Sequence, residues 1–195
     1  PGSVPTEAFA SSPWVHLGGV ALTHPKGRAA TAALLAAASA ADCPVSFDVN
    51  YRADLVPDGD ADAVSAAIRE TVAASDVVLC SDEDASAAGL STSEGEGLAR
   101  DLVAAGPHTA AVTRGADGAL AVSSEAAPWG ASTVRHDGFP VDAVDATGAG
   151  DAFTAGLLSR LAGEEASDGG GGFLREALAF ADATEALSAR WAGGR

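Results

Sequence analysis

The sequence is poor in aromatic residues and in basic residues. Aromatic side chains make up 5% of the 195 residues, and Lys26 is the only lysine. The low aromatic content favours helices packed on a sheet over an aromatic-rich β-sandwich. Because basic residues are few, the formal net charge is −16, and the molecule repels phosphate backbones and anionic membrane surfaces. We therefore expect neither nucleic acid nor a membrane among its partners.

Long apolar runs and metal-binding patterns are also missing. No run approaches the roughly 18 to 20 apolar residues that span a bilayer, and the N-terminus lacks a basic segment followed by an apolar one. Cys43 and Cys80 lie far apart without the spacing of metal ligands, which indicates buried reduced thiols. The four histidines are scattered, which argues against a metal hydrolase. We expect a soluble, cytoplasmic protein.

The acidic residues are spread along the chain and do not form a tail. Excess surface carboxylate of this kind is typical of a halophilic protein, in which high salt screens the self-repulsion. A GC-rich genome, which favours Ala, Gly, Asp and Arg codons, is the alternative explanation. Such genomes usually supply more arginine as well, so a halophilic source is favoured.

Short apolar runs alternate along the chain with longer amphipathic ones. Strands are predicted near residues 14–17, 45–49, 76–80, 110–113 and 119–122, and helices near 28–41, 60–74, 95–105, 151–161 and 173–190. Residues 123–144 are read as irregular. The alternation implies an α/β fold, with a mostly parallel sheet covered by helices on both faces, and the length fits one domain.

Ligands of such sheets bind beyond the carboxyl ends of the strands. Segments 50–52, 81–84, 114–118 and 148–151 are all expected at that edge, each as a connection that follows a strand or precedes a helix. Four segments that converge on one edge predict a binding site there.

The stretch D-A-T-G-A-G-D, residues 145–151, leads directly into a predicted helix. Gly148 and Gly150 permit backbone conformations that let a ligand approach the main chain. The free N–H groups of the first helical turn, at the positive end of the helix dipole, suit an anion such as phosphate. Asp151 would repel that anion unless it takes a proton from a hydroxyl that attacks it, as phosphoryl transfer to an alcohol requires. A plain turn with a favourable first-turn acid is the alternative.

Residues 144–156, V-D-A-T-G-A-G-D-A-F-T-A-G, closely resemble the C-terminal signature of the ribokinase-like, or PfkB, carbohydrate kinases. The resemblance implies a three-layer αβα sandwich and phosphorylation of a sugar hydroxyl with ATP and Mg²⁺. It implies Asp151 as the catalytic base and the backbone of Gly148, Ala149 and Gly150 as the anion hole. Residues 113–118, T-R-G-A-D-G, resemble the family's nucleotide-binding T-x-G-x-x-G turn. The ATP-binding residues that follow from the resemblance are Asn50, Ser81, Thr113, Arg114, Gly115, Gly118, Thr147 and Asp182.

Residues 47–52, F-D-V-N-Y-R, resemble the 2-keto-3-deoxygluconate kinase branch of the family. In that branch Asn50 and Arg52 would reach toward phosphate and the acid sugar. Arg52 suits this role because a planar guanidinium holds a carboxylate or phosphate through two hydrogen bonds. A surface ion pair of Arg52 with Asp48 or Asp54 is the alternative.

Two segments depart from the family's pattern. Where the family often has N-x-x-E, which organises Mg²⁺ through water, residues 81–84 read S-D-E-D. Asp84 is the candidate that accepts hydrogen bonds from metal-bound water, although its side chain is shorter. Asp182 stands beside the implied adenine pocket where an asparagine is frequent, and we expect it to affect nucleotide preference.

The resemblance covers residues 1–195 but only the C-terminal portion of the family's fold. We therefore expect a partial kinase domain that lacks the N-terminal strands and β lid and is weakly active or inactive alone. The expected substrate is a sugar or sugar acid of the 2-keto-3-deoxygluconate type, with a fructokinase, ribokinase or nucleoside kinase as the alternative.

Two further alternatives lie outside the kinase class. A noncatalytic nucleotide-binding module is disfavoured because Asp151 would repel a bound phosphate without serving it. A Rossmann dinucleotide enzyme is disfavoured because the glycine motif lies late in the chain. A homo-oligomer of the full-length protein is left open.

Overall fold

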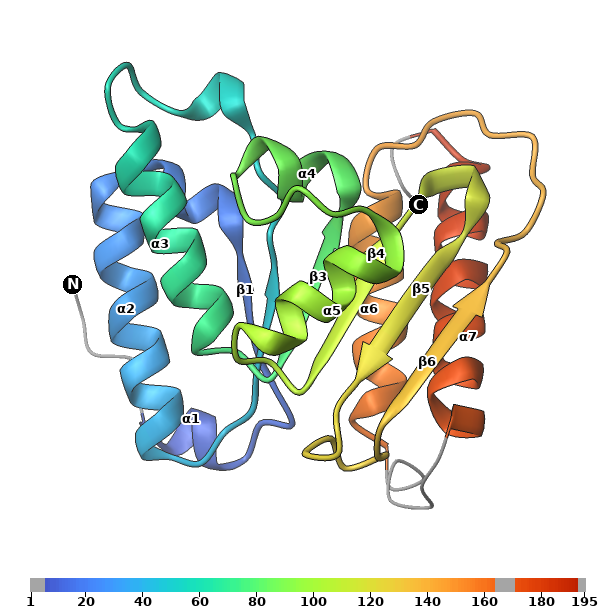
Figure 1. The fold of residues 1–195 in the computed structure, drawn as a ribbon, viewed down its shortest axis with the longest axis horizontal. Coiled ribbons are helices and arrows are strands. Elements are labelled where there is room, and N and C mark those ends of the chain that lie inside the picture. The colour runs from blue at the N-terminus through green and yellow to red at the C-terminus, as the bar shows by residue number, and fades with distance from the viewer. Residues whose placement is uncertain (1–5, 164–170, 193–195) are drawn as a thin grey trace.

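The computed structural model describes residues 6–163 and 171–192. Six strands form one sheet, and their order across the sheet is their order in the chain (Figure 1). Strands β1 to β4 pair in parallel, whereas β5 is antiparallel to both β4 and β6. This confirms the mostly parallel sheet. The strands are β1 (Val15–Gly18), β2 (Val45–Asp48), β3 (Val77–Ser81), β4 (Thr109–Thr113), β5 (Ala119–Ser123) and β6 (Ser132–His136).

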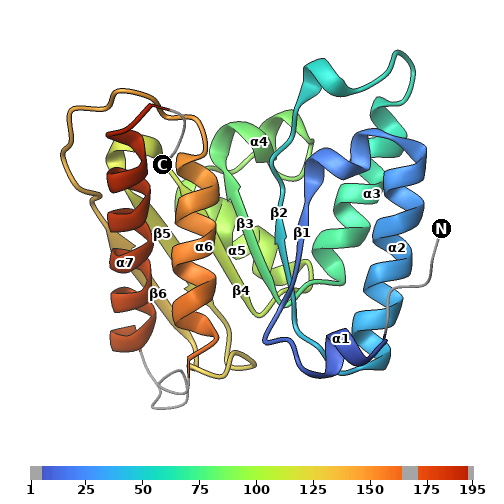
Figure 2. The ribbon, with the colours of Figure 1, turned by 180° about the vertical axis from the view of Figure 1, so that it is seen from behind.

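Helices cover both faces of this sheet, as predicted. Helices α2, α3 and α5 pack on one face, and α6 and α7 lie on the other, as the view from behind shows (Figure 2). None of the described helices is long and apolar enough to cross a membrane. The α-helices are α1 (Thr6–Ala10), α2 (Pro25–Ala40), α3 (Ala61–Ala73), α4 (Asp82–Ala87), α5 (Gly95–Ala104), α6 (Ala149–Leu161) and α7 (Gly171–Ala189). Three short 3-10 helices are η1 (Gly19–Thr23), η2 (Ala53–Leu55) and η3 (Gly115–Asp117).

The side chains of β3 alternate between two hydrophobic cores. Val78 and Cys80 belong to the core shared with α2, α3 and α5, whereas Val77 and Leu79 belong to the core shared with α6 and α7. A parallel strand buried on both faces needs an apolar residue at every position, which explains the continuous run V-V-L-C in the sequence. The sheet is therefore packed against helices on both faces.

Helices α6 and α7 approach closely at Gly156. A Cβ atom at this position would lie 2.3 Å from Thr184 Oγ1 and 3.1 Å from Ala181 Cα. The Thr184 hydroxyl lies 2.9 Å from the carbonyl oxygen of Ala152 on α6 and 2.7 Å from that of Ala181 on its own helix. Because Gly156 has no side chain, α6 can lie close against α7, and the Thr184 hydrogen bond joins the two helices.

The structure corrects the interpretation of two segments. Residues 123–144 were expected to be irregular, but they contain β6, which pairs with β5 along its whole length. Residues 81–84 were expected to form a connection, but Ser81 caps α4, its Oγ accepting a hydrogen bond from the Asp84 amide at 3.0 Å. A side-chain oxygen at this position satisfies a first-turn N–H group that has no helical partner.

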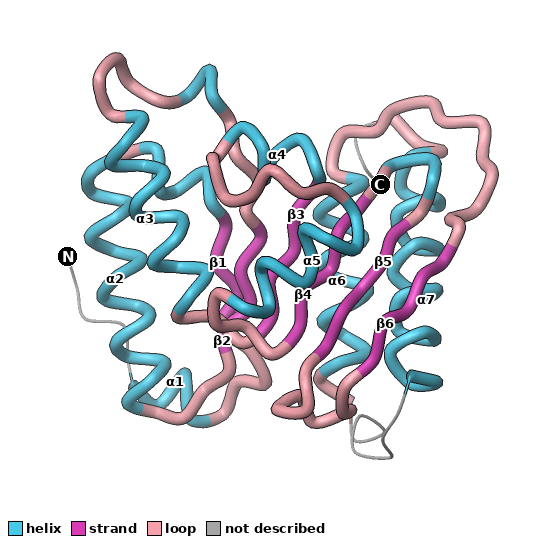
Figure 3. Tube along the Cα trace, in the orientation of Figure 1, coloured by secondary structure: helices cyan, strands magenta, loops and turns pink. Residues whose placement is uncertain are grey.

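The segments that follow β1, β2, β3 and β4 gather at one end of the sheet (Figure 3). They lead into η1, η2, α4 and η3, and the amino end of α6 lies at the same edge. This is the edge where the sequence predicts a binding site.

Candidate active site

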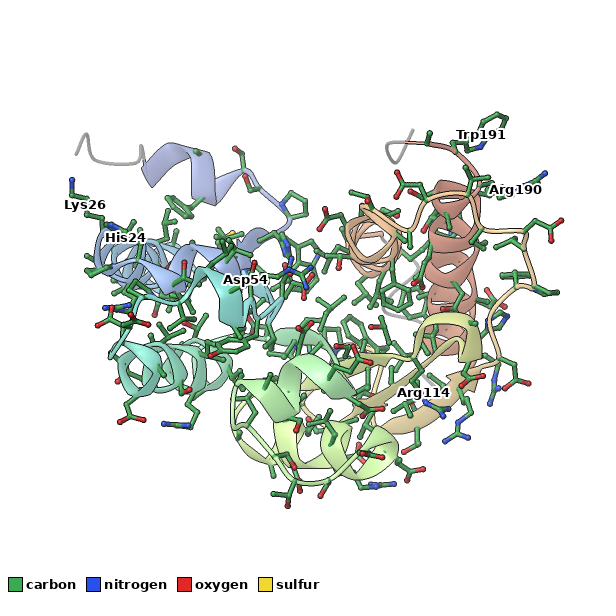
Figure 4. The ribbon with its side chains drawn as sticks, turned by 90° about the horizontal axis from the view of Figure 1, so that it is seen from above. His24, Lys26, Asp54, Arg114, Arg190 and Trp191 are labelled. Carbon is green, nitrogen blue, oxygen red and sulfur yellow. The ribbon has the colours of Figure 1, made fainter. Side chains whose placement is uncertain are left out.

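A cleft of about 330 Å³ lies at the carboxyl ends of the parallel strands. Figure 4 looks onto this edge of the molecule, with Asp54 on one side and Arg114 on the other. The strands β2, β3 and β4 supply one wall, and the amino end of α6 supplies the other. The lining residues are Asp48, Asn50, Arg52, Leu79, Cys80, Ser81, Asp84, Thr113, Ala146, Thr147, Gly148, Gly150, Asp151 and Thr154.

The glycine motif, residues 145–151, forms a tight turn at the amino end of α6. Gly148 adopts a left-handed conformation, with φ of 79° and ψ of 2°, which a residue with a side chain rarely takes. The Thr147 amide donates to Asp145 Oδ1 at 2.9 Å, which fixes the turn. The Ala149 amide donates to the Ala146 carbonyl at 3.1 Å, so this N–H group is used within the turn. The backbone of Gly148 and Gly150 lines the cleft.

Asp151 lies in the first turn of α6 and lines the cleft. Burial is the main cause of the raised pKa of Asp48 on β2 and of the lowered pKa of His16 on β1; the Asp151 carboxylate adds to the first shift and opposes the second. These effects place Asp151 across from β1 and β2. A carboxylate in this position can accept a proton from a hydroxyl bound between the two walls.

Two further carboxyl groups stand on the strand side of the cleft. Burial raises the pKa of Asp48 to about 6, and the neighbouring Asp84 carboxylate adds to the shift. The Thr154 hydroxyl, 3.5 Å from Asp48 Oδ2, partly offsets it. Burial also raises the pKa of Asp84, against the opposing effects of the Ser81 hydroxyl and the Arg52 guanidinium. The cleft therefore brings several carboxyl groups close together.

Arg52 and Asn50 approach the same space from the segment after β2. The described ion pairs do not include Arg52, so its pairing with Asp48 or Asp54 is not formed; the guanidinium lies near Asp84. Asn50 has a positive φ of 30°, which is uncommon for a residue with a side chain, and its buried Oδ1 has no hydrogen-bond partner among the described residues. Strain and an unpaired polar atom together are typical of a binding site.

A second groove of about 370 Å³ adjoins the cleft, and Ala146 lines both. It lies between η3, the segment after β6, and α7, and most of its lining is apolar. The lining residues are Gly115, Ala116, Gly138, Phe139, Pro140, Val141, Ala143, Ala146, Ala149, Asp182, Glu185, Ala186 and Ala189. An apolar groove beside a polar cleft fits a ligand with one flat apolar end and one charged end.

The polar part of this groove comes from α7. Asp182 Oδ2 lies 2.6 Å from His136 Nδ1, and its side chain is 1% exposed. Burial, and then the Asp182 carboxylate, raises the pKa of Glu185 to about 7. Both acids lie on the face of α7 that borders the groove, because residues three apart share one face of a helix.

The structure divides the predicted site residues into three groups. Asn50, Arg52, Ser81, Asp84, Thr113, Thr147, Gly148, Gly150 and Asp151 line the cleft. Gly115, Ala149 and Asp182 line the groove. Arg114 and Gly118 line neither.

The two residues outside the cleft and the groove belong to the turn around η3. Arg114 is exposed (Figure 4). Gly118 allows a close backbone contact, since a Cβ there would lie 2.2 Å from the His136 carbonyl oxygen.

Sequence reasoning missed Asp48 and Thr154 in the cleft, Glu185 in the groove, and His136, which contacts the groove residue Asp182. Asp48 carried a usable signal, because a charged residue ends an otherwise buried strand. Thr154 and Glu185 each follow a predicted site residue by three positions, Asp151 and Asp182 respectively, so helical spacing could have indicated them. His136 gave no signal, since its strand was not predicted.

Among the described residues, no group of three or more His, Cys, Asp or Glu side chains is arranged to hold a metal ion. The carboxylates of the cleft therefore do not form a protein-only cage. They fit an ion whose other ligands come from a bound phosphate and from water.

The chain belongs to the pfkB family of carbohydrate kinases, whose family model matches residues 3–195. It is 34% identical over 154 residues to a fructokinase of Salmonella thompson, covering 79% of this chain and 66% of that protein. It is 36% identical over 164 residues to a 2-dehydro-3-deoxygalactonokinase of Haloferax volcanii, covering 82% of this chain and 46% of that protein. The chain thus spans only about half to two thirds of the length of these relatives.

Solved structures of the family share the fold. A fructokinase of Vibrio cholerae O395, determined with fructose, ADP and calcium ion, superposes with a TM-score of 0.79 at 26% identity, covering 98% of this chain and 60% of that one. An aminoimidazole riboside kinase of Salmonella enterica, complexed with aminoimidazole riboside and an ATP analogue, gives 0.75 at 28% identity, covering 92% and 57%. These confirm the ribokinase-like α/β architecture.

Proposed function

We propose that this chain is the ATP-binding and catalytic portion of a sugar kinase. It would transfer the γ-phosphoryl group of ATP to a hydroxyl of a sugar or sugar acid. The observation that carries the proposal is the meeting, in one cleft, of the amino end of α6, the Asp151 carboxylate and the connections after β2, β3 and β4. Phosphoryl transfer depends mainly on such positioning and on electrostatic stabilisation.

Each wall of the cleft has a separate role in this proposal. Asp151 accepts the proton of the substrate hydroxyl as its oxygen forms a bond to the γ-phosphorus, and the bond from that phosphorus to ADP breaks. The first turn of α6, entered through Gly148, Ala149 and Gly150, supplies the positive end of a helix dipole toward the transferring group. The proton stays on Asp151 until product leaves.

The nucleotide would lie across both the groove and the cleft. The apolar groove takes the base, with Gly115 and Asp182 in its lining, and the phosphates pass Ala146, which lines both spaces, into the cleft. Thr113, Thr147, Ser81 and Asn50 present polar groups on the cleft side. Arg114 and Gly118 act through the shape of the turn in which they lie.

Mg²⁺ fits the cleft as an ion held chiefly by the phosphates. When bound, it would neutralise the charge of the transferring group. Asp84 would hold it through water, because its half-buried carboxylate lines the cleft and no protein-only cage is formed by the described residues. The ion would also offset the crowding of Asp48 and Asp84.

A sugar acid of the 2-keto-3-deoxygluconate type is the substrate that we favour. Arg52 supports this choice, because it lines the cleft without forming an ion pair among the described residues and can clasp a carboxylate. The similarity to the Haloferax volcanii protein agrees with it. Fructose is supported equally by the similarity to fructokinases, and it carries no carboxylate.

The test is ATP consumption by the complete gene product at high and low KCl, with Mg²⁺ and a panel of 2-keto-3-deoxygluconate, fructose, ribose and adenosine. We expect Asp151→Asn to lower the turnover about 10² to 10⁴-fold, the typical contribution of a general base, while ATP still binds. Asp142→Asn makes the same charge change in an exposed loop and should leave turnover unaltered.

The outcomes separate the alternatives. Full activity of Asp151→Asn would contradict the role of this residue as the base. Binding of ATP without turnover of any panel member would favour the noncatalytic module. Arg52→Gln should raise KM for the acid sugar and leave KM for fructose unchanged, and an equal effect on both would contradict a carboxylate clasp.

A further inference from the structure

A further depression, which we call the amino-edge pocket, lies at the opposite end of the sheet from the cleft and has a volume of about 450 Å³. Each of the four parallel strands contributes the residue that directly precedes it: Trp14 before β1, Pro44 before β2, Asp76 before β3 and His108 before β4. Leu161 adds the carboxyl end of α6, the helix whose amino end lines the cleft. A space of this size is typical of a small-molecule site, and it shares no lining residue with the cleft or the groove.

Asp76 is the acidic residue of this pocket, and no lysine or arginine is among the described residues that line it. Its carbonyl oxygen accepts hydrogen bonds from the amides of His108 at 3.0 Å and Thr109 at 3.2 Å. Its Oδ2 accepts a hydrogen bond from the Val45 amide at 2.8 Å, which fixes the carboxylate at the start of β3. Oδ1 has no hydrogen-bond partner among the described residues and is not fully buried. One fixed carboxylate oxygen is therefore open to a ligand.

The remaining walls of the amino-edge pocket are largely apolar. Trp14 is half-buried and Pro128 is exposed, and both line the pocket. The His108 ring meets the Trp129 ring edge to face, with 5.3 Å between the ring centroids. Burial lowers the pKa of His108, against the opposing effect of the Asp76 carboxylate, so the imidazole is uncharged at neutral pH. The pocket thus offers one negative charge among aromatic and aliphatic side chains.

We propose that the amino-edge pocket binds a small organic cation, a primary ammonium group carried on an aromatic body. The ammonium donates to Asp76 Oδ1, while its body packs against Trp14, an indole ring of the kind that attracts cations. A guanidinium fits less well, because its two parallel hydrogen bonds need both carboxylate oxygens and the Val45 amide already binds Oδ2. An anion is disfavoured by the carboxylate and by the net charge of −16. The inference does not rest on the proposed function, because none of these residues lines the cleft or the groove.

The experiment follows the backbone amide and indole N–H signals of this chain by NMR during titration with four probes that share a phenethyl body. The probes are phenethylamine, phenethylguanidine, 2-phenylethanol and 3-phenylpropionate, at pH 7 and constant ionic strength. We expect phenethylamine to bind about 10-fold more tightly than 2-phenylethanol, the lower end of the range for a hydrogen bond to a charged group, because Asp76 is half-buried. The shifts should centre on Trp14, Asp76 and His108, and 3-phenylpropionate should cause none there.

Three variants assign the effect to this pocket. Asp76→Asn removes the charge but keeps an oxygen for the Val45 amide, and it should abolish the preference for phenethylamine over 2-phenylethanol. Asp42→Asn makes the same charge change at an exposed residue near the start of β2 that does not line the pocket, and it should leave the preference unaltered. Ala162→Arg places a positive charge at an exposed lining position at the end of α6, and it should weaken the binding of phenethylamine.

The results can overturn this inference without affecting the proposed function. Equal binding of phenethylamine and 2-phenylethanol by the unchanged chain would refute it, and this comparison needs no variant, so it decides even if Asp76→Asn does not fold. Shifts confined to the cleft, where other carboxylates lie, would refute it as well. A folded Asp76→Asn protein that still prefers the ammonium, or tighter binding of phenethylguanidine than of phenethylamine, would contradict the role of Oδ1.

Discussion

Replacement of Asp48 by asparagine should stabilise the protein at neutral pH, because the native carboxylate is held in an unfavourable place. Asp48 ends β2, is half-buried and lies near Asp84 and Asp151 in the cleft. Burial first, and then the Asp84 carboxylate, raises its pKa from the ordinary 3.8 to about 6. The ionised group therefore costs folding free energy, and the uncharged amide has nearly the same shape.

The magnitude follows from the shift and depends on pH. A shift of about two units corresponds to about 3 kcal/mol as an upper limit. Because the folded protein binds this proton more tightly than the unfolded chain, the penalty is absent below the unfolded pKa, grows as pH rises, and is complete above about pH 6. Asp48→Asn should then be more stable than the native chain at pH 7.5 and about equally stable below pH 4.

The assay is urea denaturation of both proteins at a series of pH values at constant ionic strength. Asp54→Asn, a change at an exposed position after β2, is the matched control and should show no such trend. A stability difference that stays constant between pH 4 and pH 7.5 would refute the electrostatic reasoning. In the complete enzyme, the more stable Asp48→Asn protein should also lose turnover if this carboxylate serves the cleft.

Three other substitutions test the packing of two glycines and the contribution of a surface ion pair. Gly156→Ala should lower the free energy of unfolding by about 1 to 2 kcal/mol, because overpacking against Thr184 outweighs the roughly 1 kcal/mol gain in helix propensity. The loss should be smaller in a Thr184→Ala background, and a double-mutant cycle in denaturant measures this coupling. Gly118→Ala, at φ of 76° and against the backbone after β6, should cost about 2 to 4 kcal/mol, and an unchanged urea midpoint would contradict the close contact. Arg100→Gln removes an exposed ion pair on α5, and thermal unfolding should show a change below about 0.5 kcal/mol.

The sequence predicted the elements whose burial repeats along the chain. Strand β3 is apolar at successive positions. Helix α5 begins at Gly95, and α6 begins directly after Gly148, as the sequence indicated. Strand β6 was missed because only Val134 among its five residues is buried, so its existence depends on pairing with β5 and not on its own pattern. Pairing across a sheet cannot be read from local periodicity.

The cleft was more predictable than the groove. Asp151 and Asp84 stand at positions that the strand and helix ends bring to one edge, and the structure places both in one cleft. The contact between His136 and Asp182 joins residues 46 positions apart and depends on how α7 lies against β6. The sequence indicated Asp182 through resemblance, but it could not show that one of its oxygens has no hydrogen-bond partner in the described part of the chain.

The identical order of the strands in the chain and in the sheet affects how the protein is made. Each strand that leaves the ribosome can join the edge of the strands already in place, without waiting for a later segment to be inserted between them. The Thr154 hydroxyl that contacts Asp48 is synthesised 106 residues later, which at the usual speed of translation is roughly 5 to 20 s. During that interval Asp48 lacks its partners on α6. The contributions of Asp151 and Thr154 to the Asp48 pKa are therefore acquired only when α6 docks, so the electrostatics of the cleft are completed late in assembly.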